Sequence, residues 1–211
     1  KWRRDRLELR CVSKSVHLQE IPYCPDSCEL FERIRDLPRA ALLDSSSPHA
    51  STGRYDILTA QPWCDTVPRL VQGADERACQ AYFAELKRFH LEHYHGVQQV
   101  SSDIPFCGGL LGYLGYDLGK GLHSIQSPAQ SSSFPAVQLC AYDWCVIQDH
   151  LLQRATLVTQ PRVGRAQRQD LLARLRQPVK RGAAGFTLTS SFASSLSTEQ
   201  YREAFEQIQA Y

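Results

Sequence analysis

The stretch Phe106–Gly119, FCGGLLGYLGYDLG, places five glycines among large apolar side chains. Glycine loses the most backbone freedom on folding, so glycines in a strand usually mark a close approach of backbone or ligand. The spacing does not fit a phosphate-binding loop, because Leu114 stands at the required first glycine before Gly119-Lys120, and it does not fit the dinucleotide-binding pattern. We predict a strand that packs closely against a neighbouring element through Gly108, Gly109, Gly112 and Gly115.

Composition and charge narrow the classes of function. The chain has 211 residues and a formal net charge of +2, which is too small to indicate a nucleic-acid-binding protein. The basic segment 162–181 lacks the interleaved aromatic residues that stack on bases. No apolar run approaches the roughly 18 to 20 residues needed to cross a bilayer. We therefore expect no nucleic-acid partner and no membrane partner.

The eight cysteines are scattered along the chain, several of them within apolar segments. A disulfide-stabilised domain is typically shorter and richer in loops, so we predict reduced thiols and a cytoplasmic protein. The close pairs Cys24/Cys28 and Cys140/Cys145 could suggest zinc, but the second pair lies in a predicted strand and no CxxC motif recurs, so we expect no metal site in this chain.

Helical and strand patterns alternate irregularly. Asp26 or Ser27 is expected to begin a short helix, and 39–60 reads as two strands joined by a polar loop. A long helix is predicted over 75–95 and a basic one over 165–176, with a hairpin formed by strands 137–147 and 154–159. This mixture without regular βαβ alternation predicts an α+β fold.

The last segment has the strongest helix signal. Ser197 to Gln200 has the form of a capping box, and Tyr201, Phe205 and Ile208 then fall on one helical face. No capping signal precedes Tyr211, so we expect this chain to be the front part of a longer protein. No serine, histidine and acid pattern indicates nucleophilic catalysis, and the chain is expected to contain no catalytic residue.

Several fragments read in order resemble one family. They are HLQEIPY (17–23), LFERIRDLPRAALLDSS (30–46), GRYDILTAQP (53–62), IPFCGGLLGYLGYDLG (104–119), YDWCVIQDH (142–150) and FASSLSTEQYREAFEQIQAY (192–211). Together they are similar to the N-terminal region of component I of the chorismate-utilising enzymes, the family of aminodeoxychorismate synthase and anthranilate synthase. The elements Asp143-Trp144 and Asp149-His150 look more like the aminodeoxychorismate branch.

The resemblance implies packed antiparallel β-sheets flanked by helices, with the glycines allowing close packing of two sheets. It implies an extension over 1–16, the N-terminal domain over 17–160, a basic helix and linker over 161–190, and the first helix of a chorismate-binding domain over 191–211. The family's catalytic lysine, acidic residues and Mg²⁺ ligands belong to that later domain. None of them is carried over to this chain, which by itself is expected to be inactive.

The resemblance also implies an activity for the longer protein. With ammonia from a glutamine amidotransferase partner, the aminodeoxychorismate enzyme converts chorismate to 4-amino-4-deoxychorismate for 4-aminobenzoate and folate synthesis. Two alternatives stay open. One is component I of anthranilate synthase, which serves tryptophan synthesis, and the other is a free-standing tryptophan-binding module.

One ligand pocket can be carried over by motif. Leu42–Ser45 match the family's leucine-leucine-acid-serine motif, and Arg54–Asp56 match its arginine-aromatic-aspartate motif. By resemblance a tryptophan pocket would be lined by Ser45, Thr52, Gly53, Arg54 and Tyr55. Arg54 can bind a ligand carboxylate through a charge-assisted hydrogen bond, or it can instead hold the polar loop.

Overall fold

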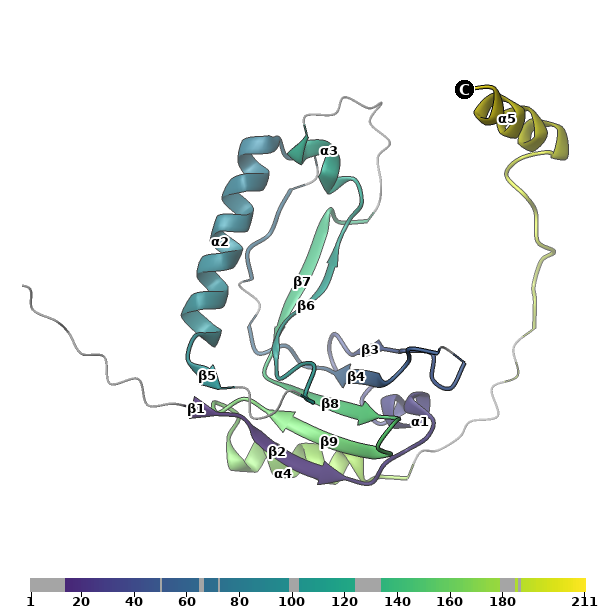
Figure 1. Ribbon diagram of the computed structural model, residues 1–211. Coiled ribbons are helices and arrows are strands. Elements are labelled where there is room, and N and C mark those ends of the chain that lie inside the picture. The colour runs from purple at the N-terminus through teal and green to yellow at the C-terminus, as the bar shows by residue number, and fades with distance from the viewer. Residues whose placement is uncertain are drawn as a thin grey trace, which may run out of the picture. The chain divides into compact units, whose positions relative to one another are not determined.

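The computed structural model describes residues 14–49, 51–64, 67–71, 73–98, 103–123, 134–178, 185 and 187–211. The chain divides into two compact units, Lys1–Val179 and Lys180–Tyr211 (Figure 1). Most of the predicted extension over 1–16, and residues 179–184 and 186 of the predicted linker, lie outside the described residues.

A five-stranded antiparallel sheet organises the first unit (Figure 1). Its strands, in spatial order, are β2 (His17–Ile21), β9 (Arg154–Thr159), β8 (Trp144–Asp149), β4 (Tyr55–Thr59) and β3 (Ala41–Leu43). The central strands are rich in β-branched and aromatic residues, which suit a pleated and buried surface. The prediction of two strands joined by a loop over 39–60 is confirmed, because β3 and β4 pair antiparallel.

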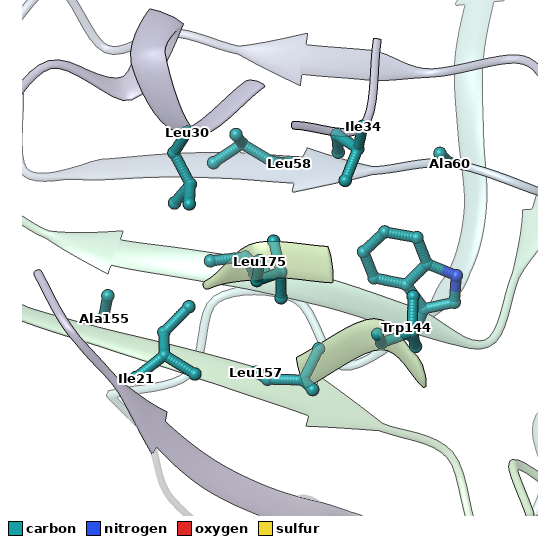
Figure 2. Packing of buried hydrophobic residues seen from close by; sticks show 11 residues of the cluster. Ile21, Leu30, Ile34, Leu58, Ala60, Trp144, Ala155, Leu157 and Leu175 are labelled. Atoms are coloured by element: carbon teal, nitrogen blue, oxygen red, sulfur yellow. The ribbon is translucent and has the colours of Figure 1, made fainter. Parts of the chain in front are cut away.

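One face of this sheet is covered by α1 (Ser27–Glu32) and α4 (Arg165–Leu175). Asp26 begins α1, because its side chain accepts a hydrogen bond from the Cys28 amide at 2.9 Å. Figure 2 shows Leu30 and Ile34 beside Leu58, while Leu175 reaches the sheet from α4. The predicted basic helix therefore contributes its leucines to the core.

The opposite face carries a second buried cluster, formed by every other residue of β8 and β4. Cys145 and Ile147 are buried there with Val158 of β9, and Ile57 packs against them. The alternation follows from the period of two along a strand, which sends neighbouring side chains to opposite faces.

A smaller sheet pairs β6 (Gly109–Leu114) with β7 (Val137–Tyr142). The long helix α2 (Glu76–Tyr94) lies along it in Figure 1, and buried Cys79, Tyr82 and Phe89 on α2 join clusters that include β7. The short helix α3 (Leu118–Leu122) packs on α2, and β1 (Lys14–Ser15) pairs in parallel with β5 (Val97–Gln98).

The glycines of β6 lie against the backbone of their paired strand. A Cβ atom on Gly112 would stand 1.9 Å from the Gln138 carbonyl oxygen, and one on Gly115 would stand 2.9 Å from that of Ala136. Gly108 adopts φ +97, and a Cβ there would lie 2.8 Å from the Tyr142 carbonyl oxygen. The approach seen here is to the neighbouring strand, and a role in packing two sheets together stays a prediction.

The predicted strand 137–147 is wrong as a single element. It is two strands, β7 and β8, separated by Asp143, and they belong to different sheets. Apart from Gln138 and Asp143 the residues from Val137 to Ile147 are apolar, and this near-continuous run led to the prediction of one strand.

The second unit contains α5 (Thr198–Ala210), and the predicted capping box between Ser197 and Gln200 is confirmed. Tyr201, Phe205 and Ile208 are exposed along this helix. Antiparallel sheets flanked by helices confirm the predicted α+β fold class.

Candidate functional site

The candidate site is the loop between β3 and β4, together with the turn between β8 and β9. The two lie at one end of the five-stranded sheet, because Tyr55 at the start of β4 pairs with Asp149 at the end of β8. The His150 amide donates to the Arg54 carbonyl oxygen at 2.8 Å, which ties the turn to the loop.

Gly53 and Ser45 close the loop on itself. A Cβ atom on Gly53 would lie 2.5 Å from the Ser45 carbonyl oxygen, so no larger residue fits without movement of the backbone. Within the loop the Ser46 amide donates to Asp44 Oδ1 at 2.6 Å, in the manner of an Asx turn.

Asp56 lies beneath this loop as a buried carboxylate. Its Oδ1 accepts from the Ser45 amide at 2.7 Å and from the Ser45 hydroxyl at 2.8 Å, and its Oδ2 accepts from Ser27 Oγ. His150 Nε2 lies 2.8 Å from the same Oδ2. Burial opposes ionisation of Asp56, but the hydrogen bonds from Ser27, Ser45 and His150 outweigh it and lower its pKa.

Arg54 is held by an ion pair across the two strands. Its Nε and Nη2 atoms contact the Asp149 carboxylate, with Nη2 to Oδ2 at 2.7 Å, and its guanidinium lies 4.5 Å from the centre of the Tyr55 ring. Burial opposes ionisation of Asp149, but hydrogen bonds from Arg54 and from the Leu152 amide outweigh it and lower its pKa. A ligand carboxylate would have to bind Arg54 through Nη1 or displace Asp149.

A cavity of about 340 Å³ lies beyond Asp149 on the face of the sheet that carries Ile147. Its lining is mixed. The lining residues are Leu18, Glu20, Asp103, Ile104, Ile147, Asp149, Leu152, Arg154 and Thr156.

The residues predicted for the pocket form two contacting pairs whose side chains have different partners, because Ser45 bonds Asp56 whereas Arg54 bonds Asp149. Ser45 and Gly53 touch, Arg54 and Tyr55 stack, and the Thr52 side chain is exposed at the edge of the loop. Whether these residues bind a ligand stays a prediction.

No role was predicted from the sequence for Asp56 or His150, although both lie within the motifs that resemble the family. One signal was available. Asp56 lies directly before Ile57 and Leu58 in a strand that was expected to be buried. A buried carboxylate requires hydrogen-bond partners.

The described part of the chain has no cluster of metal-binding side chains and no membrane-crossing helix. No group of three or more His, Cys, Asp or Glu side chains there is placed to hold a metal ion. Among the described helices, none is both long and apolar enough to cross a membrane.

Comparison with known proteins gives the family. Residues 51–211 match the chorismate binding enzymes, which is more than half of the chain. The chain belongs to this family. The resemblance predicted from the sequence fragments is therefore confirmed.

Relatives above 30% identity include aminodeoxychorismate synthase component 1 from several organisms. Aminodeoxychorismate synthase component 1 of Klebsiella aerogenes is 33% identical over 90% of this chain, and that of Escherichia coli K12 is 32% identical over 86%. A chloroplastic anthranilate synthase alpha subunit 1 of Arabidopsis thaliana is 27% identical over 95% of the chain. The chain spans 43%, 40% and 42% of the lengths of these three relatives.

Proposed function

We propose that this chain is the N-terminal region of component I of an aminodeoxychorismate synthase. The intact enzyme replaces the C4 hydroxyl of chorismate with an amino group to give 4-amino-4-deoxychorismate, the precursor of 4-aminobenzoate and folate. The observation that carries the proposal is the 33% identity to aminodeoxychorismate synthase component 1 over 90% of the chain, against 27% to an anthranilate synthase subunit.

The ammonia, the metal and the location belong to the same proposal. A glutamine amidotransferase subunit supplies ammonia, and the word "component" in the relatives' names supports a partner of this kind. Mg²⁺ would be held by parts of the enzyme other than the described residues, which offer no suitable cluster. The reaction would take place in the cytoplasm.

The experiment uses the native gene product, purified from its own cells. Its intact mass is measured first, and it is then incubated with chorismate, Mg²⁺ and ammonium chloride, so that the amidotransferase is not needed. We expect a mass well above 23.9 kDa and release of 4-amino-4-deoxychorismate, identified by mass spectrometry. Formation of anthranilate would assign the chain to the other branch. A mass near 23.9 kDa without turnover would leave a free-standing binding module.

The second part of the proposal is that the loop after β3 binds tryptophan. Ser45, Thr52, Gly53, Arg54 and Tyr55 would line this pocket. Support comes from the Ser45 hydroxyl, whose proton is donated to Asp56 and whose lone pairs can accept a hydrogen bond from a ligand ammonium group. Arg54 Nη1 would meet the ligand carboxylate.

Calorimetric titration of the same native protein with L-tryptophan tests the pocket. Ser45→Ala and Arg54→Gln are each expected to weaken binding by about tenfold, the loss expected for one hydrogen bond to a charged group. The matched control is Arg165→Gln, because Arg165 is exposed on α4. Equal affinities in all four proteins would remove these residues from the pocket.

A further inference from the structure

We propose that His150 is a positioning residue, which receives a hydrogen bond from Tyr23 and, through Asp56, fixes Ser45 and the loop after β3. Its effect on ligand affinity rests on the proposed tryptophan binding. Its effect on the loop can be measured without any ligand.

The first step is the saturation of the Asp56 carboxylate. Each of its oxygens accepts two hydrogen bonds, Oδ1 from the amide and hydroxyl of Ser45 and Oδ2 from Ser27 Oγ and His150 Nε2. A carboxylate has about four lone-pair sites, so all of them are used. Asp56 cannot rotate toward one partner without loosening its bonds to another.

The second step is the protonation pattern of His150, whose side chain is only 7% exposed. An ionised Asp56 can only accept, so Nε2 must carry the proton that is shared with it. Nδ1 lies 2.8 Å from the Tyr23 hydroxyl, and in neutral histidine it is the acceptor. Burial raises the pKa of Tyr23, which keeps its hydroxyl proton available as the donor.

With a neutral His150, the hydrogen bonds run in one direction. Tyr23 donates to His150, His150 donates to Asp56, and Asp56 accepts from Ser45. This series joins the segment before α1 to the loop after β3, across the turn between β8 and β9.

The third step is the position of Ser45 between two fixed groups. Asp56 holds its amide and hydroxyl, and the Gly53 backbone lies against its carbonyl oxygen, where an added Cβ would be 2.5 Å away. Because Gly53 leaves no room on that side, a shift of Asp56 must move Ser45 or break its hydrogen bonds.

Ser27 provides the other fixed support of the carboxylate. Its hydroxyl accepts from Gln148 Nε2 at 2.6 Å, and Gln148 Oε1 accepts from the Cys24 amide at 3.1 Å. Both Ser27 and Gln148 are buried. Loss of the His150 hydrogen bond would thus leave Asp56 bonded to Ser27 of α1, but its Oδ2 would accept one hydrogen bond instead of two.

Two substitutions at His150 separate the hydrogen bond from mere packing. The amide of His150→Gln can reach the place of Nε2 and donate to Asp56, whereas the amide of His150→Asn reaches only the place of Nδ1. Amide hydrogen exchange is measured on the 211-residue chain at Ser45, with the Ile147 amide in the buried strand β8 as the reference for global opening.

We expect His150→Asn to speed exchange at Ser45 by about tenfold relative to Ile147, since a hydrogen bond to a charged group is lost. His150→Gln should stay within about threefold of the wild type, and His90→Asn, on the exposed face of α2, should change nothing. Equal acceleration in the Gln and Asn variants would mean that His150 acts by volume alone, and no acceleration in either would break the link to Ser45. Both results overturn the proposal.

The ligand measurement follows on the intact native protein. His150→Asn should weaken L-tryptophan binding by about tenfold while His150→Gln retains it. If the wild-type protein binds no tryptophan, the proposed ligand is wrong, and the exchange experiment still decides whether His150 positions the loop.

Discussion

At the scale of single residues, Asp143 shows how one side chain can mark a change in architecture. It is the one residue between β7 and β8, its carboxylate is buried, and Arg162 Nε lies 3.4 Å from its Oδ1. Burial raises the pKa of Asp143 to about 6, although Arg162 lowers it. The fold therefore carries a carboxyl group that is easier to protonate when the protein is folded.

This raised pKa predicts a pH dependence of stability. The ordinary value is 3.8, so between about pH 4 and pH 6 the folded protein binds more protons than the unfolded chain. The contribution of Asp143 to the free energy of unfolding is most favourable below this pH window and falls as the pH rises through it. Above about pH 6 the buried carboxylate is ionised and destabilises the protein fully. Asp143→Asn should remove this dependence. Relative to the variant, the wild type should lose about 2 kcal/mol across the window, measured by urea unfolding at each pH.

The control is Asp170→Asn, because Asp170 is exposed on α4. The free energy of unfolding of Asp170→Asn should change with pH in the same way as that of the wild type from about pH 4 to pH 7. Parallel curves for Asp143→Asn as well would show that this carboxyl group titrates normally.

The glycines of β6 give a second prediction at this scale. Gly112→Ala would place a Cβ atom 1.9 Å from the Gln138 carbonyl oxygen, so β6 and β7 must separate. We expect a loss of about 3 kcal/mol in the free energy of urea unfolding. Gly119→Ala in α3 meets nothing within 4 Å and should be neutral or slightly stabilising. Similar stabilities for the two variants would contradict the close approach.

Contacts between single side chains are the part of the structure that the sequence predicts least well. The motif fragments placed Ser45 and Arg54 near one another, but the partner of Arg54 is Asp149, 95 residues away. The partner of Tyr23 is His150, 127 residues away. Such contacts depend on the register of several strands, and no local pattern of polarity reports them.

At the scale of elements, α4 and α5 are two helices whose apolar side chains have different surroundings. Leu171 and Leu175 of α4 are 4% and 2% exposed, whereas Phe205 and Ile208 of α5 are 51% and 75% exposed. The sequence predicted both helices from local signals, which are the spacing of apolar residues and, in α5, the capping box. It did not predict which apolar face would be covered, since that depends on the neighbouring elements.

Because of this difference, shortening an apolar side chain to alanine should affect stability strongly in α4 and weakly in α5. Leu171→Ala should cost about 2 to 4 kcal/mol, because it leaves a cavity between α4 and the five-stranded sheet. Phe205→Ala should change the free energy of unfolding by less than about 0.5 kcal/mol, since the ring is half exposed. Both are measured by urea denaturation of the 211-residue chain. Equal losses would mean that Phe205 is buried in solution.

At the scale of the whole molecule, the ordered fragments from His17 to Tyr211 predicted the family, and the match over residues 51–211 confirms it. The fold class was predictable because helix and strand signals occur along most of the chain. The division of the strands among separate sheets was not predictable, as the break at Asp143 shows, because pairing is decided by contacts between distant segments.

Two buried cysteines can serve as chemical probes of unfolding. Cys79 is on the buried face of α2, and Cys145 is in β8 of the five-stranded sheet, and neither side chain has exposed surface. A thiol-modifying reagent can reach exposed Cys28 in the folded protein, but it should react with these two only as fast as the protein opens. Because β7 continues into β8 through the single residue Asp143, we expect Cys79 and Cys145 to be modified at the same rate. A common rate would mean that the two sheets open together, as one cooperative unit.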